Sequence, residues 1–188
     1  NEIKASQNQP LLVYNKGALI WKRTSDLKKG DYIARLNEIK TKEKSYKIYP
    51  NKIKNIVKIG KVYSIKSKNL SRSNFIRLPE VTSEELLEFL GLIVSDGNIS
   101  KKGDSITFSN NDKDLRKRFK YLLKYVFSIK NYKEYLDSRI VVYSKTLVAF
   151  LKHINFEYNN KIHIPAYFYN LPRNEIKAFI RGYFDGYG

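Results

Sequence analysis

The pattern of apolar and polar positions changes near residue 81. In residues 37–80, apolar side chains such as Ile53, Val57 and Ile65 alternate with lysines, which is typical of strands with one buried and one exposed face. From residue 82 the apolar residues recur at helical spacing. The chain therefore predicts a strand-rich segment followed by a unit that contains helices.

The first predicted helix has a clear start and a clear end. Thr82-Ser83-Glu84-Glu85 reads as a capping box, and the apolar run that follows it surrounds the helix almost completely, so the helix is expected to be buried. Gly91 lies in mid-helix, where glycine costs about 1 kcal/mol relative to alanine, so another backbone is expected to come close. Gly97 ends the helix and leaves Asp96 at its C-terminal end.

The remaining pattern repeats strands and helices. A hairpin around residues 102–104 leads into the strand "SITFSN", and a helix is expected near 111–127 with apolar residues on one face and basic residues on the other. A second strand pair is expected within 130–143, then a short helix through 147–154 and a last helix from about Asn174 to Asp185. This order predicts an α+β fold, an αββαββα unit with an antiparallel sheet.

The last predicted helix resembles the first. Aligning Gly182 with Gly91 also pairs Gly186 with Ser95 and Gly188 with Gly97. Small residues at three matched places would let two helices pack backbone to backbone. We therefore expect a pseudo-twofold pair, packed at Gly91 and Gly182, whose C-terminal ends lie side by side.

The amino-acid composition limits the classes of function that the chain can have. The 188 residues hold 36 Lys and Arg against 18 Asp and Glu, a net charge of +18, which indicates a polyanionic partner. A membrane surface is the alternative, but no apolar stretch approaches the ~20 residues that span a bilayer, and no signal-peptide pattern opens the chain. We expect a cytoplasmic, intracellular protein. The absence of Cys excludes thiol catalysis, and the absence of Met suggests a piece of a longer product.

Half of the net charge falls in one segment. Residues 37–80 contain twelve basic and three acidic side chains. They could form a solvated face of a basic protein or a ribbon that contacts the DNA backbone. The candidate DNA-binding residues in and beyond this segment are Lys52, Lys54, Lys58, Lys61, Lys66, Lys68, Arg72, Arg77, Lys101, Lys102 and Lys145.

Several motifs resemble one known family. "FLGLIVSDG" and "FIRGYFDGYG" are similar to the two motif copies of the LAGLIDADG (DOD-type) homing endonucleases, and "ITFSNNDKDL", "VVYSKTLVAFL" and "KIHIP" lie between them in the order of the intein-encoded members. The first 36 residues resemble part of an intein splicing domain, an all-β Hint-like segment. The resemblance implies a basic DNA-contacting region at 37–81, a first endonuclease domain at 82–173 and the second motif helix at 174–188, which starts a further half.

The resemblance implies a mechanism. Acids at the two helix ends would hold divalent ions, usually Mg2+, between the strands of a DNA duplex, because such ions prefer oxygen ligands. Metal-bound water would attack the phosphodiester, while the antiparallel sheet reads the major groove. On this basis Asp96 is the metal-binding catalytic acid. Lys161 matches a basic residue that assists at the active site, and Asp185 is a further acidic residue of the motif. The implied partners are double-stranded DNA and the flanking host protein of an intein.

The sequence also departs from the family. Tyr187 stands at the second acid position, and a neutral phenol is a poor Mg2+ ligand. Asp185 lies on a helix turned by about 200° from that position, so it cannot simply replace the acid. Gln9 stands where a splicing block usually has His. His153 and His163 lack ligand-like spacing, which argues against zinc.

Three hypotheses follow from these matches and departures. The chain is a homing endonuclease, a degenerate relative that binds DNA without double-strand cleavage, or a protein-splicing or interaction module. The lack of Cys and of the block His argues against splicing by this chain.

Overall fold

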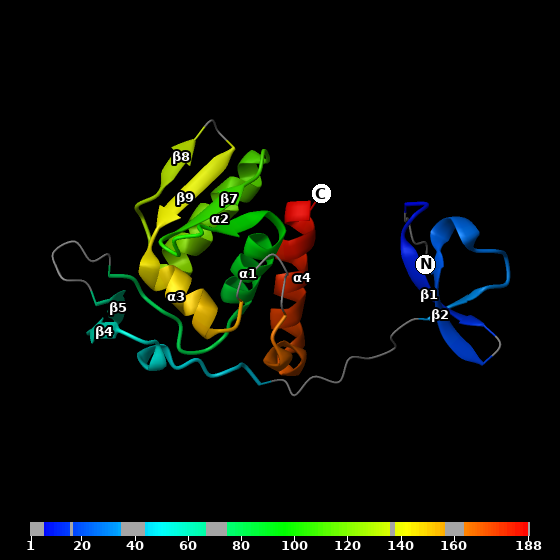
Figure 1. The fold of residues 1–188 in the computed structure, drawn as a ribbon, viewed down its shortest axis with the longest axis horizontal. Coiled ribbons are helices and arrows are strands. Elements are labelled where there is room, and N and C mark those ends of the chain that lie inside the picture. The colour runs from blue at the N-terminus through cyan, green and yellow to red at the C-terminus, as the bar shows by residue number, and fades with distance from the viewer. Residues whose placement is uncertain are drawn as a thin grey trace. The chain divides into compact units, whose positions relative to one another are not determined.

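A computed structural model of the chain describes residues 6–15, 17–34, 44–66, 75–135, 138–156 and 164–187. It divides into two compact units, Asn1–Lys40 and Thr41–Gly188 (Figure 1). No helix in the described ranges is long and apolar enough to cross a membrane. The domain boundaries that we expected at residues 36, 81 and 173 remain predictions.

The first unit is a small antiparallel sheet. It contains β1 (Pro10–Asn15), β2 (Ala18–Arg23), the 3-10 helix η1 (Thr24–Asp26) and β3 (Tyr32–Ile33), with strand order β2-β1-β3. Val13 is buried, whereas Trp21 and Tyr32 are 71% and 74% exposed. The strands agree with an all-β segment, and the Hint-like assignment stays a prediction.

The second unit alternates helices and strands. Its elements are η2 (Pro50–Lys52), β4 (Ile56–Ile59), β5 (Val62–Ile65), α1 (Glu84–Asp96), β6 (Gly97–Ile99), β7 (Ser105–Ser109), α2 (Lys113–Phe127), β8 (Lys133–Tyr135), β9 (Arg139–Tyr143), α3 (Lys145–His153), η4 (Ala166–Asn170) and α4 (Arg173–Tyr187). From α1 onward this order matches the predicted one, with η4 inserted before α4. The predicted α+β class with antiparallel sheets is confirmed.

The four-stranded sheet has the order β6-β7-β9-β8, and all neighbours are antiparallel. Its inner face buries Ile106 and Phe108 of β7 together with Ile140 and Val142 of β9. The helices cover this face, since Phe108 stacks on Phe119 of α2 with ring centroids 4.4 Å apart. The core therefore lies between the sheet and the helices, and the opposite face of the sheet is left uncovered by α2.

Helix α1 spans the predicted residues, but Ser83 alone caps its start. The expected capping box is wrong, because Thr82 exchanges hydrogen bonds with the Tyr46 backbone and not with Glu85. The Ser83 side chain accepts a hydrogen bond from the Leu86 N–H at 3.3 Å, which caps the first turn. At the other end the Gly97 N–H donates to the Ile93 carbonyl. A Cβ at Gly97 would lie 2.7 Å from the Ile93 Cα and would overlap the Ile93 carbonyl oxygen. Only glycine fits where the helix passes directly into β6.

The basic segment ahead of α1 forms a short hairpin that packs on the core. β4 and β5 pair in a two-stranded sheet of their own. Ile48, Ile53 and Tyr63 are buried in the same core cluster as the helices, and the Ile65 N–H donates to Thr146 Oγ1 of α3 at 3.0 Å. The apolar half of the alternating pattern thus attaches the segment to the second unit.

A buried carboxylate links three helices. Glu88 of α1, whose side chain is 6% exposed, accepts hydrogen bonds from Arg118 Nε and Nη2 of α2 at 2.6 and 2.7 Å. Arg181 of α4 donates to the same carboxylate at 2.7 Å. Burial alone would raise the pKa of Glu88, but the hydrogen bonds from the two guanidinium groups outweigh it and lower that pKa below its ordinary value of 4.5. We call this group the Glu88 cluster.

We expect Glu88→Gln to lower the free energy of unfolding by about 2 kcal/mol near neutral pH, because charge-assisted hydrogen bonds are lost. A carboxyl with a lowered folded-state pKa stabilises the protein above its unfolded-state pKa, and this contribution is lost as pH falls through the folded-state pKa. The deficit should therefore shrink when denaturant unfolding is repeated at pH 3. Glu85→Gln, on the same helix, is the control. An equal deficit at both pH values would contradict the role of the charge.

Candidate functional site

The candidate site begins at the contact between α1 and α4, which lie side by side (Figure 1). A Cβ at Gly91 would overlap the Phe179 carbonyl oxygen and lie 2.7 Å from the Tyr183 nitrogen. A Cβ at Gly182 would overlap the Glu88 carbonyl oxygen and lie 3.2 Å from the Leu92 nitrogen. These contacts are reciprocal: when the helices are aligned at their glycines, Glu88 pairs with Phe179 and Leu92 with Tyr183. Backbone therefore meets backbone about a local twofold axis.

The same contact brings the two C-terminal ends together. A Cβ at Gly186, near the end of α4, would lie 2.7 Å from Ser95 Cβ and 2.9 Å from Asp96 Oδ2. At the N-terminal ends, Asn174 Nδ2 of α4 donates to Glu84 Oε1 of α1 at 2.7 Å. The helices thus run parallel, and the half-buried Asp96 carboxylate lies against the last turn of α4.

The Asp96 carboxylate is oriented by a residue that sequence reasoning missed. Asn110 Nδ2 donates to Asp96 Oδ2 at 2.8 Å, and Asn110 Oδ1 accepts from the Asp112 N–H at 2.6 Å. Arg116 Nη1 also donates to the Asn110 carbonyl oxygen at 2.9 Å. Because both ends of the amide are engaged, its NH2 group is held toward Asp96. The sequence does not point to this role of Asn110, because "NNDKDL" is read first as the N-terminus of a helix.

For the other predicted catalytic residues, the structure either shows no contact with Asp96 or does not describe the residue. Asp185 is exposed on α4, one residue before Gly186. Tyr187 is the last residue of α4, and its side chain is not described. Lys161 and His163 fall outside the described residues. The structure therefore brings Asp96 and Asn110 together, and the roles expected for Asp185 and Lys161 stay predictions.

The side chains near Asp96 provide only some of the ligands that a hard cation such as Mg2+ prefers. The α1 end offers a carboxylate oxygen, and oxygen is the ligand that Mg2+ prefers. Among the residues that the structure describes, however, no three Asp, Glu, His or Cys side chains converge as a ready metal cluster. Asp96 is the described residue whose carboxylate would hold such an ion.

Next to this acid, the outer face of the sheet is polar. Asn98 follows Asp96 by two residues in β6 and pairs with Thr107 of β7. The cross-strand registers place the following side chains on the same outer face: Asn98, Ser105, Thr107, Ser109, Lys133, Tyr135, Arg139, Val141 and Tyr143. This outer sheet face has no acidic residue among its described strand positions. Its charge and hydrogen-bonding groups suit contact with a polyanion that displays polar edges.

Two cation–aromatic pairs lie on this face. Lys133 Nζ lies 5.7 Å from the ring centroid of Tyr143, and the Arg139 guanidinium carbon lies 5.6 Å from that of Tyr135. A hydrogen bond with Tyr135 raises the pKa of Tyr143, so its phenol stays neutral around physiological pH. The outer sheet face is therefore cationic at neutral pH. Sequence reasoning expected a sheet that reads DNA but named none of these side chains.

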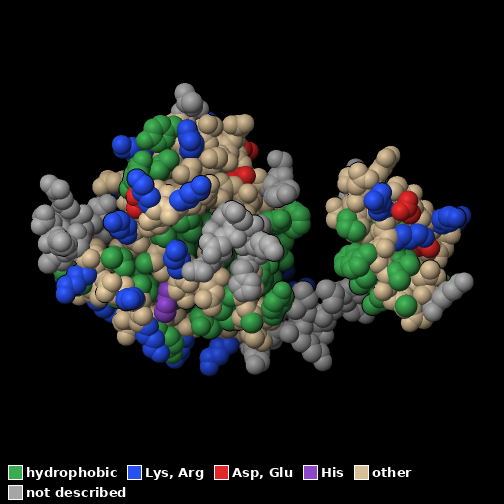
Figure 2. All heavy atoms as spheres, in the orientation of Figure 1, with side chains coloured by type: hydrophobic (Ala, Val, Ile, Leu, Met, Phe, Trp, Pro, Cys, Tyr) green, Lys and Arg blue, Asp and Glu red, His purple; other side chains and the backbone are tan. Residues whose placement is uncertain are grey.

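Most of the predicted DNA-binding residues are exposed. Lys52, Lys54, Lys58, Lys61 and Lys66 lie in and around the β4–β5 hairpin. Lys101 and Lys102 occupy the β6–β7 turn, and Lys145 begins α3. Basic side chains are spread over the visible face of residues 41–188, with few acidic ones among them (Figure 2). Lys68 and Arg72 lie outside the described residues.

Two of the basic residues near this surface already have partners. Lys58 Nζ pairs with Glu80 Oε1 at 3.2 Å. Arg77 donates from Nε to the Val126 carbonyl at 3.1 Å and from Nη2 to the Tyr125 carbonyl, so it caps the C-terminal end of α2. The predicted DNA-binding role of Arg77 therefore competes with a structural role.

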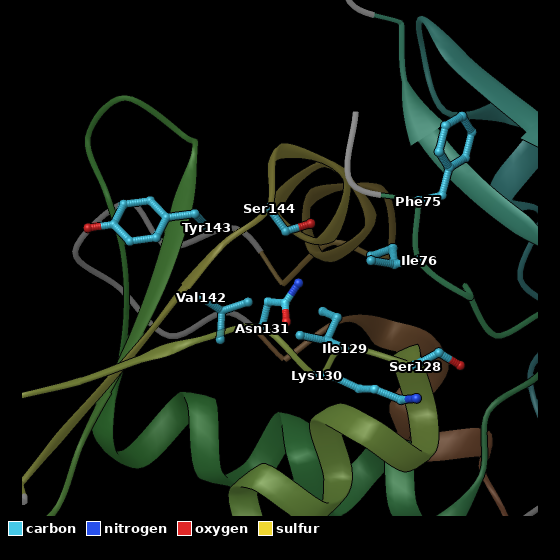
Figure 3. Close-up of a pocket in the computed structure, with 9 residues that line it drawn as sticks. All are labelled: Phe75, Ile76, Ser128, Ile129, Lys130, Asn131, Val142, Tyr143 and Ser144. Carbon is cyan, nitrogen blue, oxygen red and sulfur yellow. The ribbon is translucent and has the colours of Figure 1, made fainter. Parts of the chain in front are cut away.

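A pocket of about 300 Å3 lies beside the end of β9. Its lining comes from residues 75–76, the segment after α2, the end of β9 and the start of α3 (Figure 3). Lys130 and Asn131 are exposed at this pocket, and Tyr143 belongs to the outer sheet face as well. The pocket extends the polar surface beyond the strands.

The chain is similar in sequence to several known proteins. The family described as LAGLIDADG-like domain matches residues 83–155. Curated relatives include the Replication factor C small subunit of Methanocaldococcus jannaschii, 29% identical over 98% of this chain and 8% of the relative. An A-type ATP synthase subunit of Pyrococcus abyssi is 32% identical over 62% of this chain and 12% of the relative. The Replication factor C small subunit of Thermococcus kodakarensis is 24% identical over 98% of this chain and 17% of the relative.

The chain thus spans less than a fifth of the length of each of these relatives. The family match, by contrast, covers α1, the four-stranded sheet, α2 and α3, and it includes both Asp96 and Asn110. Residues 83–155 therefore resemble a LAGLIDADG-like domain in sequence, and they fold as an α+β unit with an antiparallel sheet.

Proposed function

We propose that this chain is part of an intein-encoded LAGLIDADG homing endonuclease, which binds a long duplex DNA site and hydrolyses phosphodiester bonds with a divalent metal. The single observation that carries the proposal is the position of Asp96. Its carboxylate lies at the paired ends of α1 and α4, and the outer sheet face, whose described strand positions hold no acid, begins two residues later at Asn98. An acid for metal binding and a cationic surface for DNA therefore adjoin each other.

The relatives support the intein context. The matched segment recurs in proteins of two different names, and it makes up 8% and 12% of the respective relatives. A segment that accounts for a small part of two differently named proteins has the properties of an inserted element. The proposed further partner is accordingly the host protein that flanks this segment.

Each residue of the site has a separate role in the proposed DNA binding and hydrolysis. Asp96 holds the metal, and Asn110 keeps the Asp96 carboxylate in one orientation through the 2.8 Å hydrogen bond. When bound, a divalent ion such as Mg2+ supplies Lewis-acid chemistry at the phosphate. The outer sheet face and the lysines of the β4–β5 hairpin neutralise backbone phosphates and fix the duplex. Lys161, in the predicted first endonuclease domain, and Asp185, on the second motif helix, assist the reaction.

A second candidate function is DNA binding without double-strand cleavage. It is favoured by Tyr187, which stands on α4 at the place equivalent to Asp96 on α1. With one carboxylate at the paired helix ends, metal coordination is lopsided. A chain of this kind would bind the duplex and cut one strand at most.

DNA binding is tested by its salt dependence. If about six phosphates are neutralised, the affinity for a duplex should fall about 1,000-fold between 50 and 200 mM salt. Fluorescence anisotropy with a labelled duplex would measure this. The double variant Lys133→Ala/Arg139→Ala should reduce the slope of log K against log salt by about 2.

The matched control is Lys113→Ala/Lys152→Ala, which removes the same charge from exposed positions on α2 and α3. It should leave the slope closer to that of the unsubstituted chain. A salt-independent affinity would contradict nucleic-acid binding altogether. Equal slopes for the two double variants would contradict the assignment to the outer sheet face.

A further inference from the structure

Helix α2 presents a second surface with aromatic and basic side chains. Tyr121 and Tyr125 lie four residues apart, and their rings stack with centroids 5.5 Å apart and an interplanar angle of 13°. They are 47% and 50% exposed. The opposite side of α2 is buried through Phe119, which contacts the inner face of the sheet at Phe108. The tyrosines therefore face away from the sheet and are separate from the outer sheet face.

The two rings continue a column that begins with a cation. The guanidinium carbon of Arg118 lies 4.9 Å from the ring centroid of Tyr121, and its Nε and Nη2 are fixed on Glu88. Arg118, Tyr121, Tyr125 and Ser128 follow one another at spacings of three, four and three residues, so they form one stripe along the helix. The Glu88 cluster thus holds one end of the column in place.

The column ends at a hollow. Ser128 follows the helix with a left-handed backbone, at φ 58°, and its side chain is small. A pocket of about 390 Å3 is lined here by Arg77, Tyr121, Lys124, Tyr125 and Ser128. No acidic side chain is among the described residues that line it. A flat ring could occupy this hollow and extend the stack on Tyr125, with the cation of Lys124 beside it.

We propose that this face of α2 binds an unpaired base of single-stranded DNA, which stacks on Tyr125 while Lys124 contacts the adjoining phosphate. Aromatic side chains next to cations bind single strands in this way, because every base has a π face and every nucleotide carries a charge. A duplex cannot use the hollow, since its bases already stack on one another. The net charge of +18 favours the same polyanionic partner.

A local reporter separates this site from the rest of the basic surface. Trp21 is the sole tryptophan of the chain, so the double variant Trp21→Phe/Tyr125→Trp carries one fluorophore at the proposed stacking position. Oligo(dT) should quench its emission, because a stacked base quenches tryptophan. A duplex of equal length and inorganic polyphosphate should not. Equal quenching by polyphosphate, or none by oligo(dT), would overturn the proposal.

Affinity gives a second readout. At fixed salt, Tyr125→Ala should weaken oligo(dT) binding about tenfold, the usual range for the loss of one stacked base, whereas Tyr125→Phe should retain the affinity. Tyr169→Ala is the matched control, because Tyr169 is 67% exposed and lies on η4. Equal affinity of Tyr125→Ala and Tyr169→Ala for oligo(dT) would refute stacking at this site.

Discussion

The Gly182→Ala variant should lose about 3 kcal/mol of folding free energy, although alanine is the better helix former. Propensity alone would add about 1 kcal/mol of stability in mid-helix. The new Cβ would, however, overlap the Glu88 carbonyl oxygen, which is backbone and cannot move aside as a side chain can. Forcing α1 and α4 apart costs overpacking energy and loosens the hydrogen bond from Arg181 to Glu88. Denaturant unfolding with the linear extrapolation measures this loss.

Gly91→Ala should produce a loss of similar size, because the contacts of the two glycines are reciprocal. Gly60→Ala serves as the control: no atom lies within 4 Å of its added Cβ, so only its positive φ of 57° is strained. Its cost should be about 1 kcal/mol. Stabilisation by alanine at either Gly91 or Gly182 would show that the two helices do not touch there.

Under the proposed function, Asp96→Asn should reduce metal-dependent nicking of a DNA site by about 100-fold or more, with duplex affinity in metal-free buffer nearly unchanged. Loss of a metal-holding carboxylate removes several kcal/mol of transition-state stabilisation, and each 1.4 kcal/mol is worth about tenfold in rate. The amide keeps the size of the side chain and so separates chemistry from packing. The assay uses supercoiled plasmid that carries a site selected by binding from a random duplex library.

The matched control for this experiment is Asp114→Asn on the first turn of α2, an exposed acid whose partner is Lys117. Tyr187→Asp provides the converse test, since it restores a carboxylate at the second helix end and should increase double-strand cutting when a second half follows the chain. Nicking that persists in Asp96→Asn at the level of Asp114→Asn would remove Asp96 from the proposed mechanism.

The helical unit was readable from the sequence because its signals are local. Ser83 and Gly97 mark the ends of α1 through a side-chain cap and a position that admits no Cβ. Gly91 and Gly182 indicate a close contact between two backbones, because glycine in mid-helix otherwise lowers the stability of the helix. Each of these signals depends on one residue and its neighbours, so a single sequence suffices to find it.

The basic segment was less predictable. Alternation of Lys with Ile and Val does not fix the length of a strand, and the structure contains only the short β4–β5 hairpin between residues 44 and 66. Its apolar residues, such as Ile48 and Ile53, join the core of the helical unit. The segment is therefore defined by long-range packing, which periodicity cannot reveal.

Individual charged side chains were the least predictable. Arg77 and Arg118 look like surface cations in the sequence, yet one caps α2 and the other binds Glu88. Glu88 itself stands alone among leucines and phenylalanine in "LLEFLGL", and that isolation was the available signal for a buried ion pair. Partners that lie 30 and 93 residues away in the chain decide its role.

The direct junction of α1 and β6 has a mechanical consequence. Asp96 is the last residue of the helix and Gly97 the first of the strand, so no loop can absorb movement between them. Any shift of the sheet as it seats on a duplex is transmitted to the carboxylate, and any force on the carboxylate is transmitted to the sheet. Under the proposed function, the affinities for the ion and for the duplex would be thermodynamically linked, and each ligand would change the affinity for the other by the same factor.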